Sequence, residues 1–179
     1  MPHIFINNNL PGISGLLKQF PETAKPLCEL AETLLRKESS LTRGERELIA
    51  TYVSLKNDCY FCFSSHSAAA AAYFCNDYSL IDEMKKGIEN ISVSEKMKSL
   101  LLIAGKVQEG GKQVNDEIIS SAKNNGATDE EIHLTVLIAS AFCMFNRYVD
   151  GLQTFAPQGR ENYTEMGKVL AQQGYIRER

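Results

Sequence analysis

The sequence predicts an all-α protein built around a single domain. Apolar residues recur at three- and four-residue intervals through most of the chain, and no stretch alternates convincingly at a period of two. Three Ser or Thr residues are each followed three positions later by Glu, the pattern of a helix capping box. The 179 residues suit one domain of ordinary size, and 44% apolar with 23% charged residues is typical of a soluble globular protein.

The charge and hydropathy of the chain exclude two classes of partner. The formal net charge is −3, so no basic field is available to bind a phosphate backbone, and we expect no nucleic-acid partner. The longest apolar run, residues 134–145, is shorter than the roughly 18 residues that a bilayer span needs, so we expect a buried core helix and no membrane partner. Residues 1–12 lack the pattern of a secretory signal, which favours a cytoplasmic location.

The first 26 residues differ in composition from the rest. They contain four of the five prolines and two glycines, which favours an extended arm with short helical turns. Such an arm can wrap a neighbouring subunit or lie along its own domain. We therefore divide the chain into an N-terminal arm, residues 1–26, and one all-helical domain, residues 27–179.

The helices of this domain are predicted from their first turns and their breaks. Pro26 suits a first helical turn, and leucines follow it at helical spacing. The first and third capping boxes open similar segments, which suggests a duplicated helical unit. Breaks are expected at residues 57–58, 76–77, 110–111 and 124–126. The three capping boxes are Thr42/Glu45, Ser92/Glu95 and Thr128/Glu131.

Five cysteines form an odd, scattered set that does not resemble the disulfide framework of a small secreted protein. Cys28, Cys75 and Cys143 lie among apolar residues, where we expect them to fill the core. Only Cys59 and Cys62 are closely spaced. In a reducing compartment such a pair is more often catalytic or metal-binding than structural.

The spacing of Cys59, Cys62 and His66 predicts a reactive thiol site. If Asn57 or Asp58 caps a new helix, Cys59 lies in its first turn, and the three side chains fall within about 60° on one helical face. The helix N-terminus and His66 should then lower the thiol pKa.

Glu47 lies twelve residues before Cys59, in the preceding helix. If the two helices fold back as an antiparallel hairpin, the Glu47 carboxylate can contact His66 and fix its tautomer. The spacing allows this contact and does not require it.

The cysteine pair has two other interpretations. Two cysteines, a histidine and an acid can bind zinc, but three ligands within eight residues on one helical face suit a tetrahedral site poorly. A purely structural role for both thiols is also open. Neither is favoured, and we expect no metal and no cofactor.

The motif Glu-x11-Cys-x2-Cys-x3-His, here Glu47, Cys59, Cys62 and His66, resembles that of the alkylhydroperoxidase AhpD-like superfamily, which includes carboxymuconolactone decarboxylases. The flanking sequence LTRGERELIATYVSLKNDCYFCFSSHS is most similar to the peroxidase-related branch. So are GISGL (12–16), FPETAKPL (20–27) and FNRYVDGL (145–152).

This resemblance implies an AhpD-like all-helical domain, a homo-oligomer (trimer or hexamer) and thiol-dependent reduction of organic hydroperoxides. In the family scheme Cys62 attacks the peroxide and Cys59 resolves the sulfenic acid as a disulfide, while His66 and Glu47 relay protons. An external dithiol, lipoyl-type or thioredoxin-like, then reduces the disulfide.

The sequence departs from the best-known peroxidases at one position. Those proteins carry a histidine directly before the second cysteine, where this chain has Phe61. The departure puts the potency and the preferred peroxide in question. Two alternative functions remain: a lyase of the carboxymuconolactone decarboxylase type, and a redox-responsive oligomeric protein without enzymatic activity.

Overall fold

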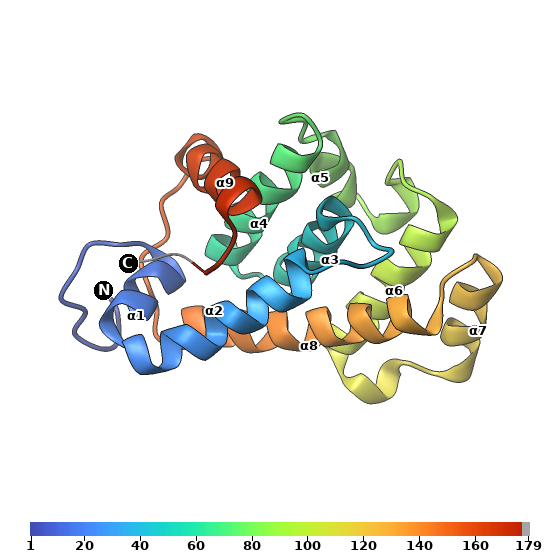
Figure 1. Cartoon of the computed structure of the whole chain (residues 1–179), viewed down its shortest axis with the longest axis horizontal. Helices are drawn as coiled ribbons and strands as arrows, with labels where there is room; N and C mark the ends of the chain where they lie inside the picture. Colours follow the sequence, from blue (N-terminus) through green and yellow to red (C-terminus); the bar gives the residue numbers. More distant parts are fainter. Residues whose placement is uncertain (177–179) are drawn as a thin grey trace.

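The computed structural model describes residues 1–176, and within that range it is helical with no β-strand, which confirms the predicted all-α fold. The α-helices are α1 (Gly12–Gln19), α2 (Pro21–Arg36), α3 (Arg43–Lys56), α4 (Tyr60–Tyr73), α5 (Ser79–Met84), α6 (Glu95–Glu109), α7 (Asp116–Asn124), α8 (Asp129–Gly151) and α9 (Glu161–Gln173), with 3-10 turns at Ile88–Asn90 and Gly111–Gln113. The chain begins with a short helix, α1, and a longer one, α2, which are followed by the hairpin of α3 and α4. Helices α5, α6 and α7 come next, and the long helix α8 and the final helix α9 complete the chain (Figure 1).

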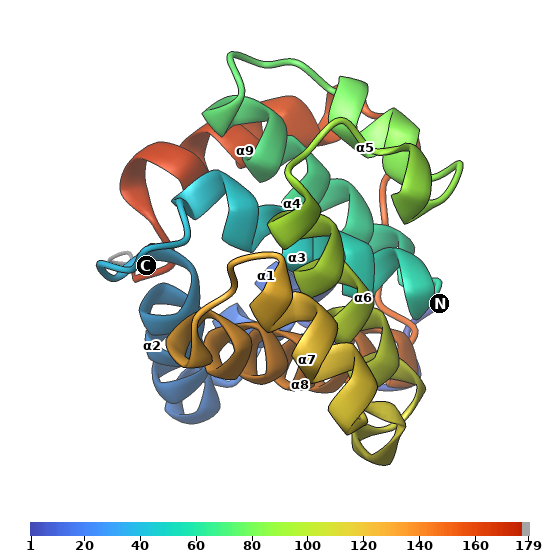
Figure 2. The same cartoon turned by 90° about the vertical axis from the view of Figure 1, so that its right-hand side faces the viewer.

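The core lies where α3, α4, α6 and α8 meet. Helix α8 runs along one side of the molecule beside α2. Helices α3 and α4 pack above α8, and α9 lies against α4 (Figure 1 and Figure 2). The contact between α4 and α9 is close, because a Cβ on Gly167 would lie 2.3 Å from the Ala68 carbonyl carbon. Buried aliphatic and aromatic side chains fill the interior, among them Leu48, Ile49, Ile103, Ile138 and Phe142.

The N-terminal residues lie along their own domain. The backbone N–H groups of His3 and Gly12 donate to the carbonyls of Leu152 and Phe155. The expected helix start at Pro26 is wrong, because α2 begins at Pro21 and continues through Pro26. The boundary drawn at residue 26 therefore falls inside a helix.

The physical reason is that either proline can be accommodated in this helix. Pro21 occupies the first helical position, where the missing N–H has no helical partner anyway. Pro26 removes one bond to the Glu22 carbonyl, but both residues are exposed, so water can hydrogen-bond to that oxygen.

Two of the three predicted capping boxes are present, Thr42/Glu45 on α3 and Thr128/Glu131 on α8. The third prediction is wrong, because Ser94 caps α6 and accepts a hydrogen bond from the Met97 N–H. The Ser92 backbone and hydroxyl instead donate to the Glu83 carboxylate at 2.7 and 3.1 Å. Ser92 is therefore bonded to Glu83, an acceptor outside the helix, and the N-cap of α6 is Ser94, two residues later.

Helix α8 is long and apolar enough to cross a membrane by length and composition alone. It nevertheless packs against α3 and α6, and 44% of its most apolar window is buried inside the protein. This arrangement is that of a core helix, as the sequence predicted.

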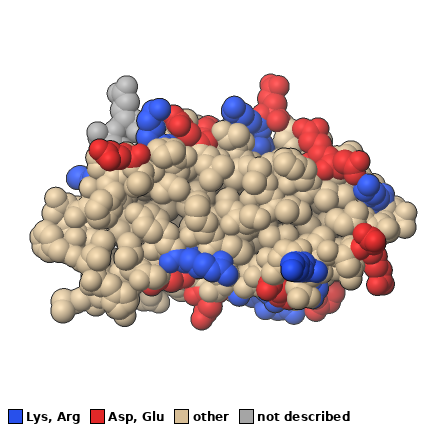
Figure 3. Space-filling view, turned by 90° about the horizontal axis from the view of Figure 1, so that it is seen from below, with Lys and Arg blue, Asp and Glu red and all other residues tan. Residues whose placement is uncertain are grey.

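The surface over α2 and α8 is poor in charge. Seen from that side, the middle of the face carries few Lys, Arg, Asp or Glu side chains, and most of the charges lie toward its edges (Figure 3). Helix α8 exposes Leu137 and Met144, which are 40% and 43% accessible and lie two turns apart on one side of the helix.

The three scattered cysteines do not share one environment. Cys143 is half-buried beside the core, while Cys75 is exposed in a turn with φ of +58°. The prediction that Cys75 fills the core is wrong, because α4 ends at Tyr73 and the following turn leaves the interior. Cys28 is half-buried and lines a cavity described below.

Candidate active site

A sharp break between α3 and α4 positions the thiol motif. Asn57 ends α3, Asp58 adopts a left-handed conformation with φ of +55°, and Cys59 occupies the N-cap of α4 with an extended backbone. The Asn57 amide donates to Asn146 at 2.8 Å, and its carbonyl accepts from Gln108 at 2.9 Å. The break is thus fixed to α6 and α8.

This geometry corrects one expectation. Neither Asn57 nor Asp58 caps α4, and Cys59 lies before the first turn instead of inside it. The helical spacing therefore relates Cys62 to His66, one turn apart on α4, but does not extend to Cys59.

Glu47 and His66 are brought into contact by the hairpin. His66 Nδ1 lies 2.8 Å from Glu47 Oε2, although the residues are 19 apart in sequence. The Glu47 side chain is 1% exposed and that of His66 12% exposed. Because a carboxylate only accepts, Nδ1 carries the proton in this bond and Nε2 is left as the acceptor of a neutral ring.

The same pair has a third partner that the sequence did not reveal. The Tyr175 hydroxyl donates to Glu47 Oε1 at 2.5 Å and lies 3.4 Å from His66 Nδ1. Burial, and then the neighbouring Glu47 carboxylate, raise the pKa of Tyr175 far above its usual range, so the phenol keeps its proton. The only sequence signal near it is Gly174, a helix-ending residue that places the next side chain outside α9.

The two thiols are buried to a similar degree but face different surroundings. Cys62 is 4% exposed and lines a cavity with His66, while Cys59 is fully buried beside Val149 and Tyr163 and does not line it. Of the two motif thiols, only Cys62 is therefore open to a reactant in the cavity.

The pKa of the Cys59 thiol is raised, contrary to the expectation that the helix N-terminus lowers it. The main cause is a side-chain hydrogen bond with Cys62, followed by burial, and the Cys62 backbone acts in the opposite direction. Beside Cys59, burial raises the pKa of Asp150, partly offset by a hydrogen bond from the thiol. Cys59 is thus kept as a protonated donor toward its neighbours.

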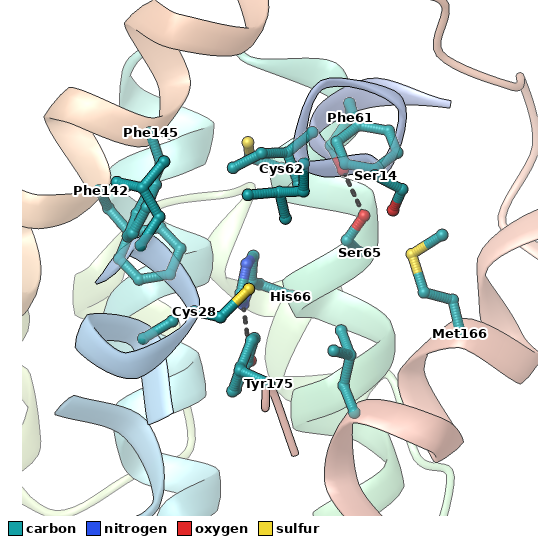
Figure 4. Close-up of a pocket in the computed structure, with 15 residues that line it drawn as sticks. Ser14, Cys28, Phe61, Cys62, Ser65, His66, Phe142, Phe145, Met166 and Tyr175 are labelled. Atoms are coloured by element: carbon teal, nitrogen blue, oxygen red, sulfur yellow. Dashed lines mark hydrogen bonds between the residues drawn. The ribbon is translucent and has the colours of Figure 1, made fainter. Parts of the chain in front are cut away.

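The cavity is lined mostly by apolar side chains, together with a few polar ones that include His66 and Tyr175. It spans about 690 Å³, part of which is open solvent, and among residues 1–176 no Lys, Arg, Asp or Glu side chain lines it. Figure 4 shows the His66 ring between Cys62 and Tyr175, with the Phe142 and Phe145 rings to one side. The lining residues are Ile13, Ser14, Leu17, Leu27, Cys28, Ala31, Phe61, Cys62, Ser65, His66, Phe142, Phe145, Met166, Leu170 and Tyr175.

Phe61 has a structural reason for its place between the cysteines. Its ring is 3% exposed, packs edge-on against Tyr163 at 5.9 Å, and lies against Gly12, where a Cβ would be 2.3 Å from the ring. Phe61 thus joins α4 to α1 and α9 in apolar packing, where a histidine would bring a polar ring.

Within residues 1–176, no three His, Cys, Asp or Glu side chains converge as a set of metal ligands. Both Glu47 oxygens and His66 Nδ1 are engaged with one another or with Tyr175. The site is therefore organised around hydrogen bonds between its own side chains.

Part of the chain that carries the site matches the model of a known protein family. The Carboxymuconolactone decarboxylase family matches residues 21–76, a segment that contains Glu47, Cys59, Cys62 and His66. Residues 21–76 are thus similar to this family, and the fold of the chain is compared with solved structures below. No curated protein matches the chain in sequence.

Solved structures show that the fold of nearly the whole chain is similar to that of known proteins. An uncharacterized peroxidase-related protein from Ralstonia eutropha JMP134, described as an alkylhydroperoxidase AhpD core, is similar at 22% identity with a TM-score of 0.77, over 89% of this chain and 82% of that one. An uncharacterized peroxidase-related protein from Silicibacter sp. TM1040 gives 21% identity and a TM-score of 0.76, over 86% and 78%. Tyr175 lies outside the segment that the family matches.

Proposed function

We propose that the protein is a thiol-dependent peroxidase that reduces organic hydroperoxides through a Cys59–Cys62 dithiol–disulfide cycle. The observation that carries the proposal is the arrangement around Cys62. This thiol lines an apolar cavity one helical turn from His66, while the second thiol is hydrogen-bonded behind it.

The first step follows from the position of His66. Neutral His66 accepts the Cys62 proton at Nε2, and the thiolate attacks the terminal peroxide oxygen. The O–O bond breaks, Cys62 becomes a sulfenic acid, and the leaving alkoxide takes the proton from His66 to give the alcohol. The bond from Nδ1 to Glu47 stabilises the imidazolium that forms in between.

The second step uses Cys59. Its sulfur attacks the Cys62 sulfenic sulfur, the S–O bond breaks, and the hydroxide leaves as water with the Cys59 proton. Cys59 does not line the cavity, so the first attack falls to Cys62. An external dithiol, lipoyl-type or thioredoxin-like, exchanges with the disulfide and restores both thiols.

The cavity supports an uncharged organic peroxide as substrate. Its walls are aromatic and aliphatic, so they stabilise an apolar alkyl or aryl group by excluding water. Among residues 1–176, no Lys or Arg side chain lines the cavity to pair with the carboxylate of a lactone acid, so this part of the chain favours the peroxidase over the lyase alternative.

We also propose a cytoplasmic homo-oligomer, trimeric or hexameric, that buries the exposed stripe of α8. Leu137 and Met144 lie on one side of that helix, and the face over α2 and α8 is poor in charge (Figure 3). Sedimentation of the protein and of Leu137→Glu measures the assembly directly. A wild-type monomer would contradict the proposal.

The test of the chemistry is disulfide formation. Reduced protein mixed with cumene hydroperoxide should form one Cys59–Cys62 disulfide per chain, seen by mass spectrometry of alkylated peptides. Cys62→Ser should lower peroxide consumption with dithiothreitol at least about 100-fold, because the attacking sulfur is lost. Cys75→Ser, at an exposed thiol away from the cavity, is the matched control and should keep the wild-type rate.

Two outcomes would contradict the proposal. Full turnover by Cys62→Ser would show that the reaction does not use this thiol. A disulfide that forms and changes the sedimentation of the protein, with negligible peroxide turnover, would favour the redox-responsive protein without enzymatic activity.

A further inference from the structure

The C-terminal segment delivers a hydroxyl to the buried side of the Glu47–His66 pair. Glu47 Oε2 is held by His66, and Glu47 Oε1 accepts from Tyr175 at 2.5 Å. The Tyr175 ring stacks on the His66 ring at a centroid distance of 6.1 Å and an interplanar angle of 11°. Both Glu47 oxygens therefore have a donor, although the side chain is almost completely buried.

Contacts with α2 fix the position of Tyr175. Its backbone N–H donates to Glu32 Oε2 at 2.7 Å, and Glu32 is paired with Arg36 at 3.1 Å. The Arg36 guanidinium donates to the Leu170 and Ala171 carbonyls at the end of α9. These bonds hold the end of α9 against α2.

Gly174 makes this approach possible. It has φ of +81°, and a Cβ there would lie 2.4 Å from Glu32 Oε2. Tyr175 therefore enters the site from a turn that is fixed on both sides, at Glu32 and at Glu47.

We propose that Tyr175 is a positioning residue that fixes the Glu47 carboxylate and, through it, the His66 tautomer with Nδ1 protonated. The hydroxyl hydrogen is directed to Glu47, so the Glu47 oxygen facing His66 remains an acceptor for Nδ1–H. Nε2 is then the free basic nitrogen on the other side of the ring, and Figure 4 shows the ring between Tyr175 and Cys62.

Loss of the hydroxyl has a defined physical consequence. Glu47 Oε1 would be buried without a donor, and the carboxylate would rotate or recruit water to satisfy it. Either change weakens the preference for the Nδ1-protonated tautomer. The role of Tyr175 in catalysis rests on the proposed peroxidase function, whereas its effect on the His66 tautomer does not depend on that function.

The experiment is Tyr175→Phe, which removes the hydroxyl and keeps the ring against His66. In ¹⁵N NMR of histidine-labelled protein, the neutral wild-type His66 should show one tautomer with Nδ1 protonated, and the variant a mixture. Disulfide formation driven by cumene hydroperoxide should slow by about 10- to 100-fold, the range for residues that orient a functional histidine.

The matched control is Tyr52→Phe, which removes a half-buried tyrosine hydroxyl from α3, the helix that carries Glu47. Tyr52 packs toward Gly105 of α6, so its loss should change neither the tautomer nor the rate. An equal effect of both variants would overturn the proposal, as would a single unchanged tautomer in Tyr175→Phe.

If Tyr175→Phe does not fold, a measurement on the wild-type protein still tests the proposal. The short bond to Glu47 predicts a downfield, slowly exchanging Tyr175 hydroxyl proton in ¹H NMR, and a rapidly exchanging hydroxyl would overturn the proposal. If wild-type protein does not reduce peroxide but the tautomer changes in Tyr175→Phe, the proposed function fails and the positioning role of Tyr175 stands.

Discussion

Two segments that begin alike, residues 42–66 and residues 128–152, fold differently. Each opens with a Thr/Glu capping box and continues with a leucine in the same register. The first segment breaks after 14 helical residues and turns back as α4, while the second continues as the 23-residue helix α8. If the two arose by duplication, as the sequence suggests, only the first acquired the turn.

The difference lies in the residues at the break. Asn57-Asp58 tolerates a left-handed turn, whereas the aligned Cys143-Met144 continues a helix. The turn lets His66 reach Glu47. In α8 the residue aligned with Glu47 is His133, which is exposed, and α8 instead contributes Phe142, whose ring packs edge-on against His66 at 4.5 Å. Residues 42–66 thus supply the polar groups Glu47 and His66, and residues 128–152 supply the apolar ring of Phe142 that lines the cavity.

The largest effect on the peroxidase rate is expected at position 47, and the aligned position 133 serves as its comparison. Glu47→Gln should lower the peroxidase rate by about 100-fold, because a neutral amide cannot stabilise the His66 imidazolium. His133→Gln should leave the rate unchanged. Stopped-flow measurement of peroxide consumption distinguishes them, and a similar loss in both variants would show that the two segments are not functionally distinct.

A smaller effect on stability is expected at the aligned positions 58 and 144. Asp58→Ala should lower the free energy of unfolding by about 0.5 to 1 kcal/mol, because alanine tolerates the left-handed backbone less well than aspartate. Met144→Ala, in a continuous helix and partly exposed, should change it by less than about 0.5 kcal/mol. Urea unfolding monitored by circular dichroism tests this pair, and equal changes would mean that the turn stores no local strain.

The smallest effect is expected from alkaline pH. Burial raises the pKa of Tyr163 and Tyr175 from the ordinary value of 10.0, so both keep their protons in the folded state while the unfolded chain ionises. Their contribution to stability is complete below pH 10 and is lost as the pH rises above it. Unfolding of wild type and Tyr163→Phe between pH 9 and pH 11 checks this, and the variant should lose less stability over that range than the wild type does.

The sequence predicted the fold class and the identity of the motif because both depend on local rules. Helical periodicity and two of the capping boxes are properties of a few neighbouring residues, and they are present where expected. The contact of Glu47 with His66 was allowed by the spacing and is present at 2.8 Å. The start of α2 and the cap of α6 were missed because Pro26 and Ser92 also satisfy local rules that other residues satisfied better.

What only the tertiary structure decided depends on contacts between distant segments. Cys59 packs with Cys62, Val149 and Tyr163 in the interior, so a hydrogen bond with Cys62 and then burial raise its pKa where a free helix N-terminus would lower it. Tyr175 lies 128 residues from Glu47. Its place follows from the packing of α9 on α4, from the bonds of Arg36 to the end of α9 and from the bond of Glu32 to the Tyr175 N–H. Local sequence determined which residues form the thiol motif, whereas long-range packing determined which thiol lines the cavity and which hydroxyl supports its histidine.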